Sequence, residues 1–265
     1  MEKSLLSVAG YDPTSGAGVC LDLKVFQHLG FHGVGILTSL TLQNTSRVEE
    51  VRALPPDFLW NQYRTLIDDI SVSGIKVGMI GSKTNIPVIQ TILTKNNQIP
   101  VVVDPVFKSS SGAWLLEKEA IPSYISKIKG KASLLTPNTE EAALISGIRI
   151  KTRQHMKEAA RKIHNLSQMP CLIKGGEGPG LSTDILYNGE DFYAFDQQKI
   201  AKKVHGTGCF LSSSILAYLA KGISLDKACL KAVRLTHHAI NTSLPVGKGQ
   251  HLIRFSPLSQ ISMPV

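Results

Sequence analysis

The chain has 265 residues, of which 43% are hydrophobic and only 18% are charged, a composition that can bury a substantial core without disulfides or metal ions and is not that of a disordered protein. Its formal charge of +9 comes from 29 Lys and Arg against 20 Asp and Glu. The basic residues form no run longer than pairs such as Lys202-Lys203 and lack interleaved aromatic residues, so they indicate a surface for anionic small molecules and no nucleic-acid partner.

The beginning of the sequence offers no segment suited to export or to membrane insertion. After residues 1–4, the apolar stretch before Gly10 is about five residues long, whereas a membrane span needs about 20. We therefore expect a cytoplasmic protein without a membrane partner.

Short β-branched runs alternate with stretches of helical spacing along most of the chain. Strands are predicted at residues 5–9, 33–40, 74–79, 100–103, 132–135 and 171–174, with helices between most of them. This alternation predicts one α/β domain over residues 1–265, built on a predominantly parallel, doubly wound sheet with helices on both faces.

Residues 184–195 change this pattern to two strand-like runs around Asn188-Gly189. Asn-Gly is typical of a type I′ turn, so we expect an antiparallel hairpin at the edge of the sheet. Two helices follow, one starting near Gly208 and one near Leu225.

Ligands of such sheets bind beyond the carboxyl ends of the strands, and one loop there has the composition of an anion site. In His205-Gly206-Thr207-Gly208-Cys209 the glycines let main-chain N–H groups approach an anion, Thr207 adds a hydroxyl, and the following helix directs its positive dipole end to the same place. The loop is expected to hold a transferring phosphoryl group, although a Gly-rich helix entry is the plainer reading.

Four cysteines, at positions 20, 171, 209 and 229, are scattered without a C-x-x-C pair, which argues against a zinc site and against disulfides. Cys209 lies in the first turn of a predicted helix, where the dipole is expected to lower the pKa of the thiol and make a thiolate plausible as proton acceptor. The other three are expected to be packing residues.

Three further strand ends carry polar side chains suited to nucleotide binding. Asn138 and Glu141 open a predicted helix and could position hydrated Mg²⁺ beside phosphates, or simply cap that helix. Asp104 follows an apolar strand and could hold the water shell of a metal ion, while Lys174 precedes two glycines and could contact a phosphate. A turn aspartate and a solvated lysine are the plainer readings of these two.

The Gly-rich turn at residues 9–18 lacks the spacing G-x-G-x-x-G, and no G-x-x-x-x-G-K-[ST] occurs anywhere in the chain. Neither a Rossmann dinucleotide site nor a P-loop is therefore predicted, and a polar substrate pocket is the remaining reading.

Taken in order, these motifs resemble the ribokinase-like superfamily, and within it the hydroxymethylpyrimidine and phosphomethylpyrimidine kinases of thiamine biosynthesis. The resemblance covers essentially the whole chain and rests on residues 9–18, 22–24, 41–45, 76–82, 104–106, 136–138, 174–176 and 205–209. Most of the superfamily carries aspartate at the position of Cys209, and a cysteine there resembles the pattern of this branch.

The resemblance implies ATP and Mg²⁺ as cofactors and phosphorylation of the hydroxymethyl group of 4-amino-5-hydroxymethyl-2-methylpyrimidine, and of its monophosphate. It implies a homodimer. It also assigns residues: Gln43, Gly10, Asp22, Met79 and Val106 to the pyrimidine pocket, Asn138, Glu141, Lys174 and Thr207 to the nucleotide, Asp104 and Glu141 to the metal through water, and Gly206, Thr207, Gly208 and Cys209 to catalysis.

Two departures from the family pattern bear on the pocket, because Tyr11 stands where a small residue is usual and Phe107 belongs to an altered loop. They leave a pyridoxal or pyridoxine kinase of the same branch as an alternative. A ligand sensor without catalysis is a second alternative, although such a protein has no need for phosphoryl-transfer residues.

Overall fold

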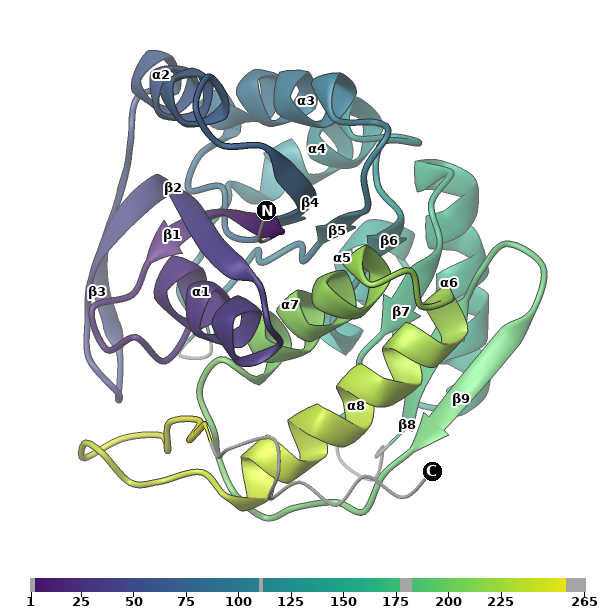
Figure 1. Ribbon diagram of the computed structural model, residues 1–265. Helices are drawn as coiled ribbons and strands as arrows, with labels where there is room; N and C mark the ends of the chain where they lie inside the picture. Colours follow the sequence, from purple (N-terminus) through teal and green to yellow (C-terminus); the bar gives the residue numbers. More distant parts are fainter. Residues whose placement is uncertain (1–2, 110–111, 177–182, 256–265) are drawn as a thin grey trace.

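Strand β1 (Ser4–Tyr11) is an interior strand of a nine-stranded sheet in the computed structural model, which describes residues 3–109, 112–176 and 183–255 (Figure 1). The strand order is β3-β2-β1-β4-β5-β6-β7-β8-β9. The pairs from β2 to β7 are all parallel, and these strands are β2 (His32–Gln43), β4 (Val72–Val77), β5 (Val101–Val103), β6 (Leu134–Leu135) and β7 (Cys171–Ile173). The predicted parallel sheet is thereby confirmed.

Both edges of the sheet are antiparallel. The predicted hairpin is confirmed as β8 (Thr183–Tyr187) and β9 (Phe192–Asp196), with β8 antiparallel to β7. The opposite edge is β3 (Val48–Ala53), which pairs with β2 and was not predicted, because its charged residues and exposed side chains hide the strand pattern.

The predicted type I′ turn is wrong. Tyr187 pairs directly with Phe192, so the loop has four residues, and within it only Gly189 has a positive φ. A type I′ turn needs positive φ at both central residues. Instead, the side chain of Asn188 accepts hydrogen bonds from the main-chain N–H groups of Glu190 and Asp191, which closes the wider loop.

Helices cover both faces of the sheet, as predicted (Figure 1). Along β1, Leu6 and Val8 belong to one core cluster while Leu5 belongs to the other, because successive side chains point to opposite faces. One face carries α2 (Pro56–Ile67), η1 (Lys83–Asn85), α3 (Ile86–Lys95), η2 (Lys118–Ala120), α4 (Ile121–Lys127), α5 (Thr139–Ser146) and α6 (Arg153–Ser167). The other carries α1 (Gly18–His28), α7 (Thr207–Ala220) and α8 (Leu225–Asn241).

Helix α7 is the most enclosed of these helices, and it is buried from Phe210 to Tyr218 without interruption. It packs against α1, α8 and strands β4 and β5, and Figure 1 shows it beside α8. The body of this helix is therefore held in the interior, whereas its first turn, from Thr207 to Cys209, is only partly buried. In the described part of the chain, no helix combines the length and apolar character needed to cross a bilayer.

Candidate active site

The loop at residues 205–209 opens helix α7, as predicted. Gly206 is the N-cap residue and has φ of 79°, the left-handed region that favours glycine. A Cβ atom there would lie 1.8 Å from the main-chain oxygen of Gly16, so only glycine fits. The Gly-rich turn after β1 and the anion loop are thus packed backbone against backbone at the N-terminus of α7.

Lys174 and Asp104 meet directly beside this helix N-terminus. Lys174 Nζ lies 2.8 Å from Asp104 Oδ1, and a Cβ on Gly208 would come within 3.0 Å of the same ammonium. Thr136 donates a second hydrogen bond of 3.2 Å to Asp104 Oδ1. The structure therefore brings together two predicted nucleotide and metal residues from different strand ends with the predicted anion loop.

The environment of Asp104 keeps its carboxylate ionised. Burial by itself would raise the pKa of Asp104, but the ammonium groups of Lys174 and Lys76 outweigh it and hold this pKa below the usual value. Lys174 and Thr136 both bind Oδ1 of this carboxylate, and the water-mediated contact of Asp104 with a metal ion stays a prediction.

Asn138 and Glu141 form a capping box at the start of α5. Asn138 Oδ1 accepts from the main-chain N–H of Glu141 at 2.8 Å, and Glu141 Oε2 accepts from that of Asn138 at 2.7 Å. The plainer reading of this motif is therefore realised. The main chain of Lys174 donates to the oxygen of Pro137, which places the cap next to the Lys174–Asp104 pair, and its role toward a nucleotide stays a prediction.

Within the described residues, no group of three or more His, Cys, Asp or Glu side chains is arranged to hold a metal ion. Asp104 and Glu141 thus offer two carboxylates, one bound by Lys174 and one in the capping box, and no complete cage. That set fits Mg²⁺, which keeps several waters and is commonly bound through one or two carboxylates together with substrate phosphates.

The side chain of Asp22 is fully buried in the protein interior. Lys76 Nζ lies 2.9 Å from Asp22 Oδ2, and both side chains have an exposed fraction of 0%. Ser7 donates to the same carboxylate at 2.6 Å and Ser213 at 2.7 Å. A direct contact between Asp22 and a substrate, which the resemblance implied, is not what this arrangement offers, because protein groups take up both carboxylate oxygens. The residues around position 76 do not predict that its lysine is buried.

Cys209 lies in the first turn of α7, but the predicted lowering of its pKa is wrong. Burial raises the pKa of the Cys209 thiol to about 11, and the opposing charge of Lys76 and the N–H of Gly18 do not compensate. The thiol is therefore protonated at neutral pH. Cys20, Cys171 and Cys229 are free thiols as well, and the last two are buried in the core as predicted.

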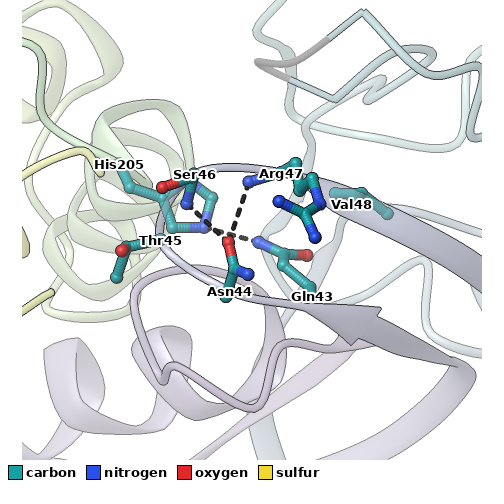
Figure 2. Close-up of a pocket in the computed structure, with 7 residues that line it drawn as sticks. All are labelled: Gln43, Asn44, Thr45, Ser46, Arg47, Val48 and His205. Atoms are coloured by element: carbon teal, nitrogen blue, oxygen red, sulfur yellow. Dashed lines mark hydrogen bonds between the residues drawn. The ribbon is translucent and has the colours of Figure 1, made fainter. Parts of the chain in front are cut away.

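A small depression at the end of β2 holds Gln43. Figure 2 shows its side chain directed at the ring of His205, with the amide nitrogen 3.0 Å from His205 Nε2. The same ring nitrogen lies 2.7 Å from Asp12 Oδ2. Burial opposes ionisation of Asp12, but hydrogen bonds with His205 and Thr14 outweigh it and hold its pKa below the usual value. No local sequence pattern predicts this link, since residues 12 and 205 are brought together only by the fold.

The other predicted pocket residues lie at the carboxyl edge of the sheet. The Cβ position of Gly10 is only 2.3 Å from Met79 Cε, so these two residues are in contact and an added Cβ would require the end of the methionine side chain to shift. Val106 is half-buried just after Asp104. Their contact with a substrate stays a prediction.

The two departures from the family pattern have different positions. Phe107 is buried in the core, where its ring packs edge-on against Tyr124, so the expectation that it reshapes the pocket is wrong. Tyr11 is exposed at the end of β1, next to the Gly-rich turn, and its effect on the pocket stays a prediction.

Comparison with known proteins gives a consistent result. The family described as phosphomethylpyrimidine kinase matches residues 12–254. A hydroxymethylpyrimidine/phosphomethylpyrimidine kinase from Aquifex aeolicus is 38% identical over 252 residues, covering 94% of this chain and 99% of the relative. The thiamine biosynthesis bifunctional protein ThiED from Geobacter sulfurreducens is 40% identical over 248 residues, covering 93% of this chain and 51% of that longer protein.

Solved structures of a phosphomethylpyrimidine kinase and of a pyridoxal kinase resemble the fold of this chain. The phosphomethylpyrimidine kinase (thiD) from Clostridium difficile 630 superposes with a TM-score of 0.79 at 34% identity, covering 90% of this chain and 100% of that one. The pyridoxal kinase from Staphylococcus aureus in complex with pyridoxal has a TM-score of 0.87 at 28% identity, covering 98% of this chain and 96% of that one. The same pyridoxal kinase has been solved with ADP, at a TM-score of 0.88 and 29% identity.

Proposed function

The chain belongs to the phosphomethylpyrimidine kinase family, and from this membership we propose that it transfers the γ-phosphoryl group of ATP to the hydroxymethyl group of 4-amino-5-hydroxymethyl-2-methylpyrimidine and of its monophosphate. It is an ATP-dependent kinase of a small molecule that serves thiamine biosynthesis. The observation that carries the proposal is the placement of the Lys174 ammonium against Gly208 at the N-terminus of α7.

That placement suits the charge that develops during phosphoryl transfer. The transition state is loose and spreads negative charge over the equatorial oxygens, so positioning and electrostatic stabilisation carry most of the catalysis. The main-chain N–H groups from Gly206 to Cys209 would bind these oxygens, with Thr207 offering a hydroxyl and Lys174 a positive charge. Asp104 keeps Lys174 directed at the loop.

Mg²⁺ would be held next to this loop by nucleotide phosphates and water, with Asp104 and Glu141 as outer carboxylates and Asn138 fixing the orientation of Glu141. When bound, the ion would neutralise charge on the phosphates. This assignment rests on the resemblance and on the donor set described above.

The acceptor would lie between Gln43 and the Gly10–Met79 contact. The amide of Gln43 can both donate and accept, which suits the alternating donors and acceptors on the edge of an aminopyrimidine. Asp12 and His205 would fix that amide from behind, and Val106 would supply an apolar contact. Asp22 would act from beneath the pocket without touching the substrate.

Cys209 would contribute its main-chain N–H and not a thiolate base. With a pKa of about 11, the thiol holds its proton at neutral pH and cannot accept another from the hydroxymethyl group. A loose transition state needs no strong base, because the acceptor hydroxyl gives up its proton late, to the transferred phosphoryl group or to water.

The test of this function is product identification. The purified protein is incubated with ATP, Mg²⁺ and the hydroxymethylpyrimidine, and the products are separated and weighed by mass spectrometry. The proposal expects a monophosphate and then a diphosphate of the pyrimidine. Formation of ADP without a phosphorylated pyrimidine would contradict it.

Pyridoxal or pyridoxine is the second candidate acceptor, because a structure of pyridoxal kinase bound to pyridoxal matches this fold at a TM-score of 0.87. The higher identity to the Aquifex aeolicus relative favours the pyrimidine. Competition between the two acceptors in one reaction, with both products quantified, separates the candidates.

We also propose a cytoplasmic homodimer. The edge hairpin β2–β3 exposes Leu40 and Leu42, the latter at 56%, and a paired subunit would cover such an apolar edge. Light scattering after gel filtration should give twice the mass of one chain, and Leu42→Lys should reduce it to a single chain.

A further inference from the structure

Lys76 is the only fully buried lysine in the described part of the chain, and the function proposed above gives it no role. Its ammonium donates two hydrogen bonds to Asp22, to Oδ1 at 3.1 Å and to Oδ2 at 2.9 Å. It also folds back over Gly78, where a Cβ would lie 2.8 Å from Nζ. A side chain at position 78 would therefore meet this ammonium.

The pair is joined to the helix that carries the anion loop. Asp22 lies in α1 and Lys76 in β4, while Ser213, which donates to Asp22 at 2.7 Å, lies in α7. Ser213 is four residues after Cys209, so both lie on the same face of α7. Ser7 of β1 completes the set. One buried carboxylate thus connects the first turns of α7 to two strands and a helix.

Stability alone does not account for a pair of this kind. A buried ion pair loses about as much through desolvation as it gains from attraction, and well-packed uncharged residues often replace it without loss. Burial would lower the pKa of Lys76, but the negative charge of Asp22 outweighs it and raises this pKa, so the ammonium stays charged. Among the charged groups, Lys76 has the largest effect on the pKa of the Cys209 thiol and lowers it, while Asp22 and Asp104 raise it.

We propose that Lys76 is a positioning residue for phosphoryl transfer: held by Asp22, its ammonium fixes the first turn of α7 and keeps a permanent positive charge beneath the anion loop. This inference rests on the proposed function. It reassigns Asp22 from substrate contact to the support of Lys76.

The test compares a neutral pair with the native one. Lys76→Met combined with Asp22→Asn removes both charges and leaves one acceptor oxygen and one amide donor for the hydroxyl groups of Ser7 and Ser213, which bind different oxygens of Asp22. We expect this variant to melt within about 4 °C of the wild type while kcat falls about 100-fold and KM stays within about threefold. Lys95→Met, which removes an exposed lysine at the end of α3, is the matched control and should keep wild-type kcat.

A second measurement reads the charge without using turnover. In a Cys20→Ser background, Cys209 is the remaining cysteine that is partly exposed, and its rate of alkylation by iodoacetamide is followed against pH. In the neutral pair, loss of the Lys76 ammonium should outweigh loss of the Asp22 carboxylate, because Lys76 acts more strongly on the pKa of Cys209, and the midpoint should move to higher pH. If the neutral pair does not fold, Gly78→Ala, which displaces the ammonium and keeps its charge, should lower kcat about tenfold at unchanged KM.

If the neutral variant folds, a kcat within about threefold of wild type overturns the proposal. If it does not fold, a kcat within about threefold of wild type in Gly78→Ala overturns the proposal instead. Should the wild type phosphorylate none of the acceptors, the proposed function fails. The alkylation profile then decides alone: an unchanged midpoint overturns the role of Lys76, and a shift to higher pH supports it.

Discussion

Lys174 Nζ lies 2.8 Å from Asp104 Oδ1 across two strand ends that are 70 residues apart in the chain, and the pair points its positive member at the first turn of α7. The two residues act as a unit. Asp104 fixes the position of Lys174, and Lys174 keeps Asp104 ionised.

Lys174→Met is therefore expected to reduce kcat about 100-fold to 1000-fold, because one fixed positive charge at the transferring phosphoryl group is lost. The substitution also leaves Asp104 buried without its partner, at a cost of about 3 to 5 kcal/mol in unfolding free energy. Steady-state kinetics well below the melting temperature separates the two effects. Wild-type kcat in folded Lys174→Met would remove Lys174 from the mechanism.

Gly206→Ala is expected to abolish activity and to destabilise the protein, since its Cβ would lie 1.8 Å from the main-chain oxygen of Gly16. Gly222→Ala is the matched control. Gly222 has a similar φ of 82° but no atom within 4 Å of its Cβ position, so only backbone strain of about 1 kcal/mol is expected. Thermal melting of both variants checks this, and equal losses would show that strain and not the packing of the two loops is responsible.

Cys209→Ala should keep kcat within about tenfold of wild type, because the main-chain N–H survives and the protonated thiol is no base. Iodoacetamide should alkylate Cys209 slowly at pH 7 and faster as the pH approaches about 11, the pKa to which burial raises the thiol. Fast alkylation at pH 7, or a 1000-fold loss of kcat in Cys209→Ala, would restore the thiolate as proton acceptor.

Asp12 and Asp104 should make the protein sensitive to acid. Both have a pKa below the usual value in the folded state, so the stability they contribute is fully present above the unfolded value of about 3.9. It is lost as the pH falls through their lower folded values. Melting temperature measured from pH 7 downwards should fall most steeply below about pH 4, and Asp12→Asn should fall less steeply than the wild type.

Gln43→Leu should raise KM for the pyrimidine and lower kcat/KM about 100-fold or more, because the donors and acceptors of the ring are left without a partner. KM for ATP should not change. An equal loss for both substrates would indicate a defect of folding and not of the acceptor pocket.

Most of the fold, and the parts of the site that lie in local motifs, can be predicted from the sequence. The parallel strands and the entry of α7 follow from apolar runs and glycine spacing, which are local signals. The Asp12–His205 contact joins residues 193 positions apart, and the Lys76–Asp22 pair joins residues 54 positions apart. No local sequence pattern predicts either of them.

Burial explains the remaining errors. A helix N-terminus lowers the pKa of an exposed thiol, but the neighbours of Cys209 along the chain do not show that the fold leaves its side chain only partly exposed. The departure of Phe107 from the family pattern suggests an altered pocket, whereas the folded chain turns its ring into the core against Tyr124. Strand β3 was missed because its charged residues face solvent at an edge.

The central claim is tested most directly by kcat/KM measured with saturating ATP and Mg²⁺ for the hydroxymethylpyrimidine, its monophosphate, pyridoxal and pyridoxine. We predict turnover of the pyrimidine with the highest kcat/KM of the unphosphorylated acceptors, together with turnover of its monophosphate. A kcat/KM for pyridoxal above that for the pyrimidine would contradict the acceptor, and absence of turnover with all four would contradict the kinase itself.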